Sequence, residues 1–350
     1  MLDGCALAVQ AILMIPDDSD EVFSRKGSTA KLAMPISPAP IALFCYKRPE
    51  HLARTLESLR VNPLARASQL HVFSDGPKHS ADRSAVEQVR ALIRNIKGFA
   101  EVLVHERVGN LGLAQSVIEG VTELSRTYGR VIVLEDDLVV APTFLTFMNQ
   151  ALQRYQDEPK IMQVSGYMFP VAHSESVGST FLCRVPASWG WGTWERAWKS
   201  LDLDSAKLLV LLQQEGKQYE FNVKGVYPYI EHLKLQAEGK LDVWGVRWYA
   251  SMFVRGGLCL YPGQSMVQNI GMDGSGFHCG ISHLFDVQLS AHDAWQFPDR
   301  IEESELALDS IRGFLTGVCG EQKSNAFMRA ASRVSAAVSR LKRAATSSAM

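Results

Sequence analysis

The sequence predicts an α/β fold in which a mostly parallel central sheet carries helices on both faces. Strand-like and helix-like segments alternate from residue 41 to residue 155, a pattern typical of parallel sheets built from strand–helix–strand units. The strand-like segments are short apolar runs without polar alternation, as expected for strands buried on both faces. A chain of 350 residues with 47% hydrophobic content can form a large core, as one domain or two.

Four strands are expected in the first half of the chain, at 41–46, 69–73, 101–105 and 131–134. Pro49 suits the first position of the first helix, and the apolar residues between strands recur at helical spacing. The second strand ends in the turn sequence Ser-Asp-Gly-Pro. The second half is expected to hold three more strands and a helical stretch, at 161–165, 180–184, 257–262 and about 203–238.

Three consecutive carboxylates, Glu135, Asp136 and Asp137, stand at the end of the fourth predicted strand. Adjacent acids repel one another, and a divalent cation such as Mg²⁺ or Mn²⁺ would offset that repulsion because it prefers hard oxygen ligands. The alternative is a solvated acidic turn. Parallel sheets bind ligands at the carboxyl ends of their strands, and Arg48 and Asp75 also follow strands. This coincidence favours a ligand site.

Four tryptophans within ten residues, Trp189, Trp191, Trp194 and Trp198, are interleaved with glycines. Aromatic faces pack well against sugar rings, and glycines let a backbone approach a ligand closely, so the segment predicts a carbohydrate contact. The alternative is a tryptophan-rich hinge that packs under the sheet. Further on, a glycine-rich loop that could cradle phosphate ends in His278, although a lone histidine is more often structural than a ligand.

The net charge of −1 gives no electrostatic reason to expect nucleic-acid binding. The six cysteines form no CxxC pair, and those at 45, 183 and 259 lie in apolar runs, which predicts reduced core thiols and a cytoplasmic protein. Residues 1–38 are expected to be a flexible leader without a signal peptide or transmembrane helix. Residues 322–350 predict a basic amphipathic helix on an anionic membrane surface, or else a solvated helix or disordered tail.

The order of these motifs resembles that of GT-A-fold glycosyltransferases, in particular bacterial sugar transferases related to family 2 glycosyltransferases and to N-acetylglucosaminyltransferase I. The motifs are an Arg-Pro after the first strand, SDG, NxGL, VLEDDL, WGWGTW and NIGxDGSGxH. The resemblance covers about residues 39–285. It implies a GT-A (Rossmann-like) domain at 39–290, with a nucleotide-sugar half at 39–155 and an acceptor half at 156–290, followed by an extension at 291–350.

The resemblance also implies roles on the donor side. Asp137 matches the residue that binds Mn²⁺ or Mg²⁺, and His278 is a further candidate for the metal or a phosphate. Glu135 and Asp136 are expected to contact sugar or ribose hydroxyls. The remaining donor contacts are expected from Arg48, Asp75 and Asn110.

The acceptor side departs from the family pattern. An inverting transfer needs a general base, and related proteins often place an acid within the Trp-x-x-x-Trp segment, where this chain has Gly245, Val246 and Arg247. Asp242 is the nearest candidate base and Glu195 the second. Arg247 could bind a phosphate or an acidic acceptor, or pair with a neighbouring carboxylate. The predicted acceptor contacts are Trp189, Trp191, Trp194, Trp244 and Arg247.

These features predict a metal-dependent, inverting glycosyltransferase that moves a hexosyl or N-acetylhexosaminyl group from a nucleotide-diphosphate sugar to a glycan or lipid-linked acceptor. The resemblance implies surface polysaccharide or lipopolysaccharide synthesis, in the cytoplasm or at the inner face of the cytoplasmic membrane. One alternative is a sugar nucleotidyltransferase, which should carry a glycine- and lysine-rich loop where this chain has residues 45–49. Another is an inactive glycan-binding or membrane-surface protein, which the missing acid at Gly245 would suit.

Overall fold

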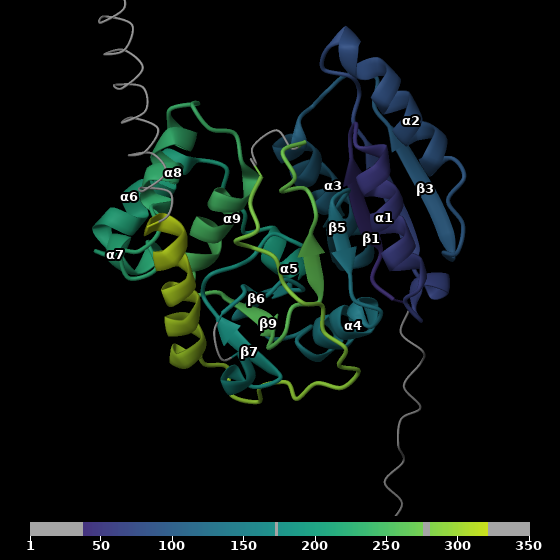
Figure 1. Ribbon diagram of the computed structural model, residues 1–350. Helices are drawn as coiled ribbons and strands as arrows, with labels where there is room; N and C mark the ends of the chain where they lie inside the picture. The colour runs from purple at the N-terminus through teal and green to yellow at the C-terminus, as the bar shows by residue number, and fades with distance from the viewer. Residues whose placement is uncertain (1–37, 172–173, 276–280, 321–350) are drawn as a thin grey trace, which may run out of the picture. The chain divides into compact units, whose positions relative to one another are not determined.

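An eight-stranded sheet runs through the part of the chain that the computed structural model describes, residues 38–171, 174–275 and 281–320 (Figure 1). The strand order is β3-β2-β1-β4-β8-β6-β9-β7, and a separate two-stranded sheet pairs β5 with β10. The strands are β1 Ile41–Cys45, β2 Gln69–Ser74, β3 Glu101–Glu106, β4 Arg130–Glu135, β5 Leu138–Val140, β6 Ile161–Ser165, β7 Thr180–Cys183, β8 Trp191–Trp194, β9 Leu258–Pro262 and β10 Val267–Asn269.

Most strands of the large sheet run in one direction. Strands β3, β2, β1 and β4 pair in parallel. Strand β8 is antiparallel to both β4 and β6, so β6 runs the same way as β4. Strand β9 is parallel to β6, and β7 is antiparallel to β9. Six of the eight strands therefore share a direction, and the predicted mostly parallel α/β sheet is confirmed.

Helices cover both faces of this sheet. Gly120 of α3 lies against Phe44 of β1, whereas Met148 of α4 lies against Gly192 of β8. Gly192 pairs with Ile132, and Ile132 pairs with Ile41, so these three residues lie on one face of the sheet. Phe44 is three residues after Ile41 in the same strand and therefore lies on the opposite face. Helices α3 and α4 thus cover opposite faces. The helices are α1 Pro49–Arg60, α2 Arg83–Ile93, α3 Leu113–Tyr128, α4 Phe144–Arg154, α5 Glu195–Trp198, α6 Ser205–Gln214, α7 Gln218–Phe221, α8 Tyr229–Ala237 and α9 Trp244–Phe253, with 3₁₀ turns at Ala65–Ala67, Ser80–Asp82 and Ser174–Val177.

The folded core extends beyond residue 290, where the sequence signal becomes weak. A helix at 305–320 buries Leu308, Ile311 and Leu315 in the same hydrophobic cluster as the sheet. The segment before it is fixed to β7, because the Ser304 amide donates to the Leu182 carbonyl at 2.9 Å. The glycosyltransferase-like halves predicted at 39–155 and 156–290 both contribute strands to the one large sheet.

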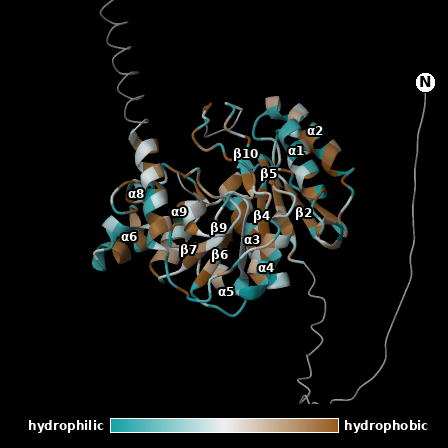
Figure 2. Cartoon of the chain, turned by 60° about the horizontal axis from the view of Figure 1, so that its bottom comes forward, coloured by the Kyte–Doolittle hydropathy of each residue, from teal (hydrophilic) through white to brown (hydrophobic). Residues whose placement is uncertain are grey.

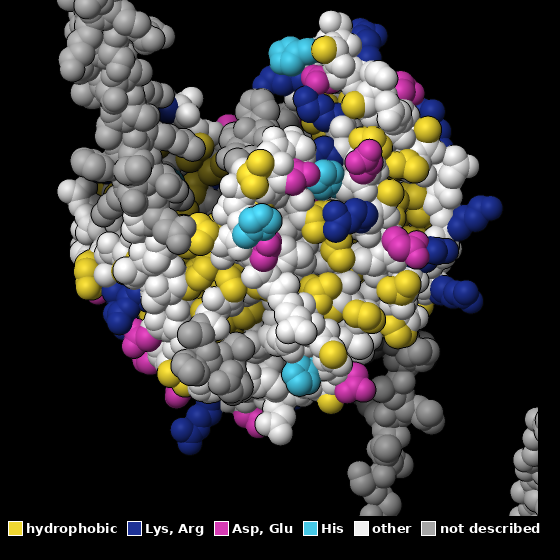
Figure 3. Space-filling view, viewed as in Figure 1, with side chains coloured by type: hydrophobic (Ala, Val, Ile, Leu, Met, Phe, Trp, Pro, Cys, Tyr) yellow, Lys and Arg dark blue, Asp and Glu magenta, His cyan; other side chains and the backbone are white. Residues whose placement is uncertain are grey.

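Figure 2 shows hydrophobic residues concentrated in the central strands, and Figure 3 shows acidic, basic and histidine side chains interspersed on one face. Cys45, Cys183 and Cys259 are buried free thiols, as predicted. Among the described residues, no helix is both long enough and apolar enough to cross a membrane.

Candidate functional site

The predicted acidic site lies where three neighbouring parallel strands end. Strand β4 ends at Glu135, β1 is followed by Tyr46–Arg48, and β2 is followed by Asp75. Because β2, β1 and β4 are adjacent and parallel, these residues share one edge of the sheet. The structure thus brings Arg48, Asp75 and the acidic triplet to the same edge, as the sequence predicts.

Arg48 neutralises two of the three acids. Its Nη2 atom donates to Asp136 Oδ1 at 2.5 Å and to Asp137 Oδ2 at 2.9 Å. The Tyr46 amide donates to the second oxygen of Asp136 at 3.2 Å. Burial lowers the pKa of Arg48, but the charges of Asp136 and Asp137 outweigh burial and raise it above its usual value. Burial and the charges of Asp137 and Asp136 raise the pKa of Glu135 to about 8.

Asp137 keeps one oxygen available. Its Oδ1 atom is buried and has no hydrogen-bond partner among the described residues. A loop closes over the other side of the residue, because the Ile270 amide donates to the Asp137 carbonyl at 2.8 Å and Gly271 packs against Oδ2. A Cβ at Gly271 would lie 2.1 Å from that oxygen. A residue with a side chain fits at this position only if the Asp137 and Arg48 side chains shift.

The available oxygen fits a hard cation. Mg²⁺ typically binds one or two carboxylates and completes its shell with water and substrate phosphates. Asp137 Oδ1 supplies one such ligand, and the described residues contain no group of three or more His, Cys, Asp or Glu side chains that could enclose an ion. An open site of this kind requires oxygens from a ligand. His278, the other predicted metal contact, lies outside the described residues.

Asp75 and Asn110 join two loops rather than presenting free groups. The Asp75 carboxylate accepts hydrogen bonds from the amides of Gly76 at 3.0 Å, Leu111 at 2.9 Å and Gly112 at 2.9 Å. The Asn110 side chain donates to the Gly76 carbonyl at 2.9 Å. These contacts fix the start of α3 beside the end of β2. The sequence predicts both residues as donor contacts, but it does not predict that they hold these two loops together.

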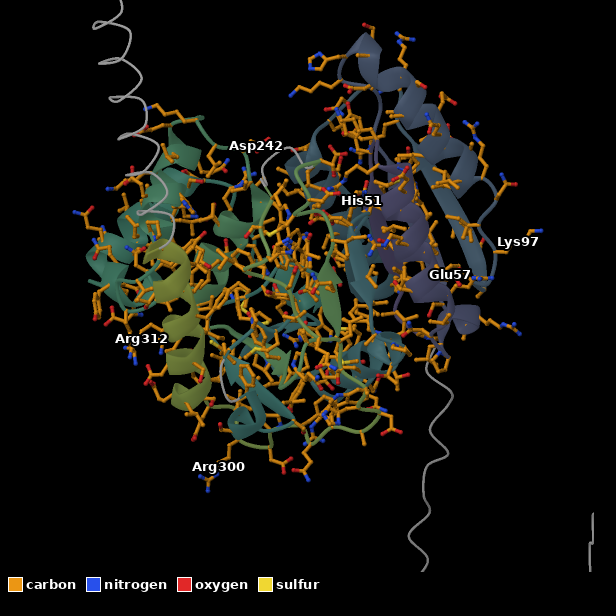
Figure 4. The ribbon with its side chains drawn as sticks, viewed as in Figure 1. His51, Glu57, Lys97, Asp242, Arg300 and Arg312 are labelled. Atoms are coloured by element: carbon orange, nitrogen blue, oxygen red, sulfur yellow. The ribbon has the colours of Figure 1, made fainter. Side chains whose placement is uncertain are left out.

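Glu195, the second candidate base, lies at the opposite edge of the sheet from the acidic triplet. Strand β8 is antiparallel to β4, so Trp194 pairs with Arg130, and the Glu195 amide donates to the Gly129 carbonyl at 2.9 Å. Glu195 is therefore beside the start of β4, roughly 16 Å from Glu135 along the strand. Asp242 is exposed at the entry to α9, near the upper end of the view in Figure 4. Its side chain lies 3.5 Å from Arg247.

Three of the predicted acceptor-binding tryptophans are core residues. Trp191 and Trp194 are 1% and 2% exposed in β8, and Trp244 is 5% exposed. Trp191 stacks on Trp244 at 4.8 Å between ring centroids, and the Trp194 ring nitrogen donates to the Leu152 carbonyl. The alternative interpretation, in which tryptophans pack under the sheet, describes these three. Trp189 is only partly buried, against Tyr167.

The structure contains a cavity that the sequence does not predict. A cavity of about 510 Å³ is lined by residues that include Arg54, Gln268, Asp273, His283 and Asp286. None of Arg48, Glu135, Asp136 and Asp137 lines it. It joins the exposed side of α1 to segments more than 200 residues away, and no local pattern marks such a contact. The predicted leader at 1–38, apart from residue 38, and the basic tail at 322–350 lie outside the described residues.

The fold and this edge define an α/β protein with an acidic, arginine-bound site at the carboxyl ends of parallel strands. No family model matches the chain, and no curated protein matches it. Among solved structures, it is similar to the mannosyltransferase PcManGT from Pyrobaculum calidifontis, in complex with GDP-Man and Mn²⁺, at 12% identity and a TM-score of 0.31. That alignment covers 52% of this chain and 48% of the mannosyltransferase, so it spans about half of that protein.

The chain is also similar to the galactosyltransferase LgtC, in complex with donor and acceptor sugar analogues, at 10% identity and a TM-score of 0.33. The alignment covers 63% of this chain and 72% of LgtC. Similarities of this size assign neither an activity nor a ligand to the chain.

Proposed function

We propose that this protein is a metal-dependent, inverting glycosyltransferase of the GT-A type. It transfers a sugar from a nucleotide-diphosphate donor to a hydroxyl of a glycan or lipid-linked acceptor, in surface polysaccharide or lipopolysaccharide synthesis. The observation that carries the proposal is the buried Asp137 Oδ1 atom at the carboxyl edge of the sheet, which has no hydrogen-bond partner among the described residues. A solvated acidic turn would not bury its carboxylate in this way.

On the donor side, Asp137 would hold Mn²⁺ or Mg²⁺ through Oδ1. The cation would supply Lewis-acid stabilisation of the negative charge that develops on the leaving diphosphate. Arg48 holds Asp137 Oδ2 at 2.9 Å and so fixes the direction in which Oδ1 points. Asp136 in turn holds Arg48 in place. Glu135 is then the member of the triplet that is left to contact a sugar or ribose hydroxyl.

On the acceptor side, Asp242 is the proposed general base. Its carboxylate is exposed, so it can reach an acceptor hydroxyl and take its proton. Trp189 is the proposed aromatic acceptor contact, because its ring is the least buried of the predicted tryptophans in β8 and its flanking segment. A donor screen would identify the sugar that is transferred.

The test is a panel of nucleotide-diphosphate sugars, assayed for hydrolysis by the full chain with Mn²⁺ and with EDTA. We expect at least one donor to be hydrolysed with Mn²⁺ and none with EDTA. A second assay supplies a nucleoside triphosphate and a sugar phosphate and measures pyrophosphate release. Pyrophosphate release without donor hydrolysis would replace the proposal with the nucleotidyltransferase alternative.

A further inference from the structure

Arg247 is a nearly buried cation without a close counter-charge. Its side chain is 13% exposed, and the nearest acid among the described residues is Asp242, at 3.5 Å. Asp242 is itself 73% exposed, and an ion pair that is both long and open to water compensates a buried charge only weakly. The Nε atom of Arg247 is buried and lacks a hydrogen-bond partner within the described part of the chain.

Two other partly buried arginines are paired closely, whereas Arg90, which is also 13% exposed, lies 3.7 Å from its nearest acids but donates to the Arg107 carbonyl at 2.6 Å. Arg48, 20% exposed, contacts two carboxylates at 2.5 and 2.9 Å. Arg184, 29% exposed, binds Glu303 through its Nε and Nη2 atoms. Burial lowers the pKa of Arg247 and the charge of Asp242 does not restore it. A desolvated guanidinium with unused donors is what a protein presents to an anionic ligand.

The surroundings of Arg247 suit a small oxyanion. Asp242 precedes the first residue of α9 by two positions, so its contact places the guanidinium beside the start of that helix. Val243, at the N-cap, provides no side-chain cap, which leaves first-turn amides without a side-chain acceptor. A Cβ at Gly245 would meet no atom of the described residues within 4 Å, so that part of the chain leaves space beside the first turn. An oxyanion there could accept from both the guanidinium and the helix amides.

The start of α9 also lies close to the acidic edge. Trp244, its first residue, stacks on Trp191 at 4.8 Å. Trp191 pairs with Val133 in β4, two residues before Glu135. Arg48 already serves the donor acids, whereas the acid that pairs with Arg247 among the described residues is Asp242, the proposed acceptor base. An anion at Arg247 therefore belongs to the second substrate.

We propose that Arg247 binds a phosphate or carboxylate group of the acceptor, and that the protein consequently selects anionic acceptors. The acceptor assignment rests on the proposed glycosyltransferase function, whereas the anion site itself does not. Arg247 is a binding and specificity residue in this arrangement. Asp242 competes with the ligand anion for the same guanidinium.

The binding test uses inorganic phosphate at constant ionic strength with EDTA, which prevents metal-mediated binding at Asp137. Calorimetry on the full chain should show phosphate binding that weakens at least tenfold in Arg247→Gln. Arg255→Gln is the matched control, since this exposed arginine lies eight residues further along and its side chain donates only to the Ser251 carbonyl among the described residues. It should bind as the wild type does. Equal phosphate affinity in Arg247→Gln and wild type, or no binding by the wild type, would overturn the site.

Repeating the titration with acetate distinguishes a phosphate site from a carboxylate site. Tighter binding of phosphate would assign a phosphorylated acceptor, and tighter binding of acetate would assign an acidic sugar. In the transfer assay, Arg247→Gln should raise KM for anionic acceptors at least tenfold and leave KM for the donor unchanged. An unchanged acceptor KM overturns the acceptor assignment. Phosphate binding at Arg247 in a chain that hydrolyses no nucleotide-sugar would contradict the proposed function and leave the anion site standing.

Discussion

The three adjacent carboxylates after β4 differ in their partners. Among the described residues, Asp136 has a donor on each oxygen and Asp137 has a donor only on Oδ2, whereas burial and the neighbouring acids raise the pKa of Glu135 to about 8. Their positions in the sequence predict a shared site. The difference between their hydrogen-bond partners arises from Arg48 and from the loop at 269–271, which lies more than 130 residues later in the chain. The position of an available oxygen is therefore a property of the folded chain.

Gly271→Ala tests how closely this loop must approach Asp137. The new Cβ would overlap Asp137 Oδ2 and lie 2.7 Å from Arg48 Nη1. Because these atoms end side chains, they can shift, so we expect a stability loss of only about 1–3 kcal/mol but a large loss of donor hydrolysis. Gly317→Ala is the control, since a Cβ there meets nothing within 4 Å. Full donor hydrolysis by Gly271→Ala would contradict the described geometry.

Between elements, Asp75 fixes the start of α3 to the end of β2. Asp75→Ala would leave the amides of Leu111 and Gly112 without their acceptor, whereas the Gly76 amide keeps the Gly109 carbonyl at 3.2 Å, and this should cost about 2 kcal/mol or more. Asp75→Asn retains one acceptor oxygen and should lose less. Urea unfolding measures both. If Asp75→Ala is as stable as the wild type and only donor affinity falls, the residue is a ligand contact and not a structural one.

Strands β2 and β3 carry a histidine pair that should make stability depend on pH. His71 Nδ1 and His105 Nε2 are 3.3 Å apart, and His71 is 3% exposed. Burial lowers the pKa of both, and the charge of His105 lowers that of His71 further, although Glu123 and Glu101 partly oppose this. The unfolded chain therefore binds more protons, so stability is complete above pH 6.5 and falls as the pH drops below it.

Urea unfolding at pH 7.5 and 5.5 checks this dependence. We expect the wild type to lose about 1 kcal/mol or more on acidification, and His105→Gln to lose less because it removes the second charge. An identical loss in both proteins would show that this pair does not control the acid sensitivity.

All seven strands that the sequence predicts are present, whereas β8 and the short strands β5 and β10 were not predicted. Strand β8 was missed because its four residues include a glycine and two tryptophans, a composition that also suits a ligand loop. Its antiparallel direction, which places Glu195 at the far edge, is set by pairing with β4 and β6. No local sequence signal indicates the direction of β8, so the sequence does not predict at which edge of the sheet Glu195 lies.

At the scale of the whole molecule, the helix at 305–320 completes the core, although the sequence predicts an extension outside the main domain at 291–350. The apolar residues of this helix follow helical spacing, so the sequence does contain a helix signal there, directly before the predicted basic tail. Ile311→Ala should cost about 2–5 kcal/mol because Ile311 is fully buried. Leu306→Ala is the control, since Leu306 is 55% exposed. Equal unfolding midpoints for the two variants would contradict the placement of this helix.

The central claim is that Asp137 holds a catalytic cation at the carboxyl edge of the sheet. The most direct measurement is Mn²⁺-dependent hydrolysis of the donor identified in the panel, compared between wild type and Asp137→Asn. The variant retains an oxygen for Arg48 but loses the charge that a cation needs. We predict a loss of hydrolysis on the order of 100-fold or more, with a urea midpoint near that of the wild type. Unchanged Mn²⁺-dependent turnover by a folded Asp137→Asn protein would contradict the claim.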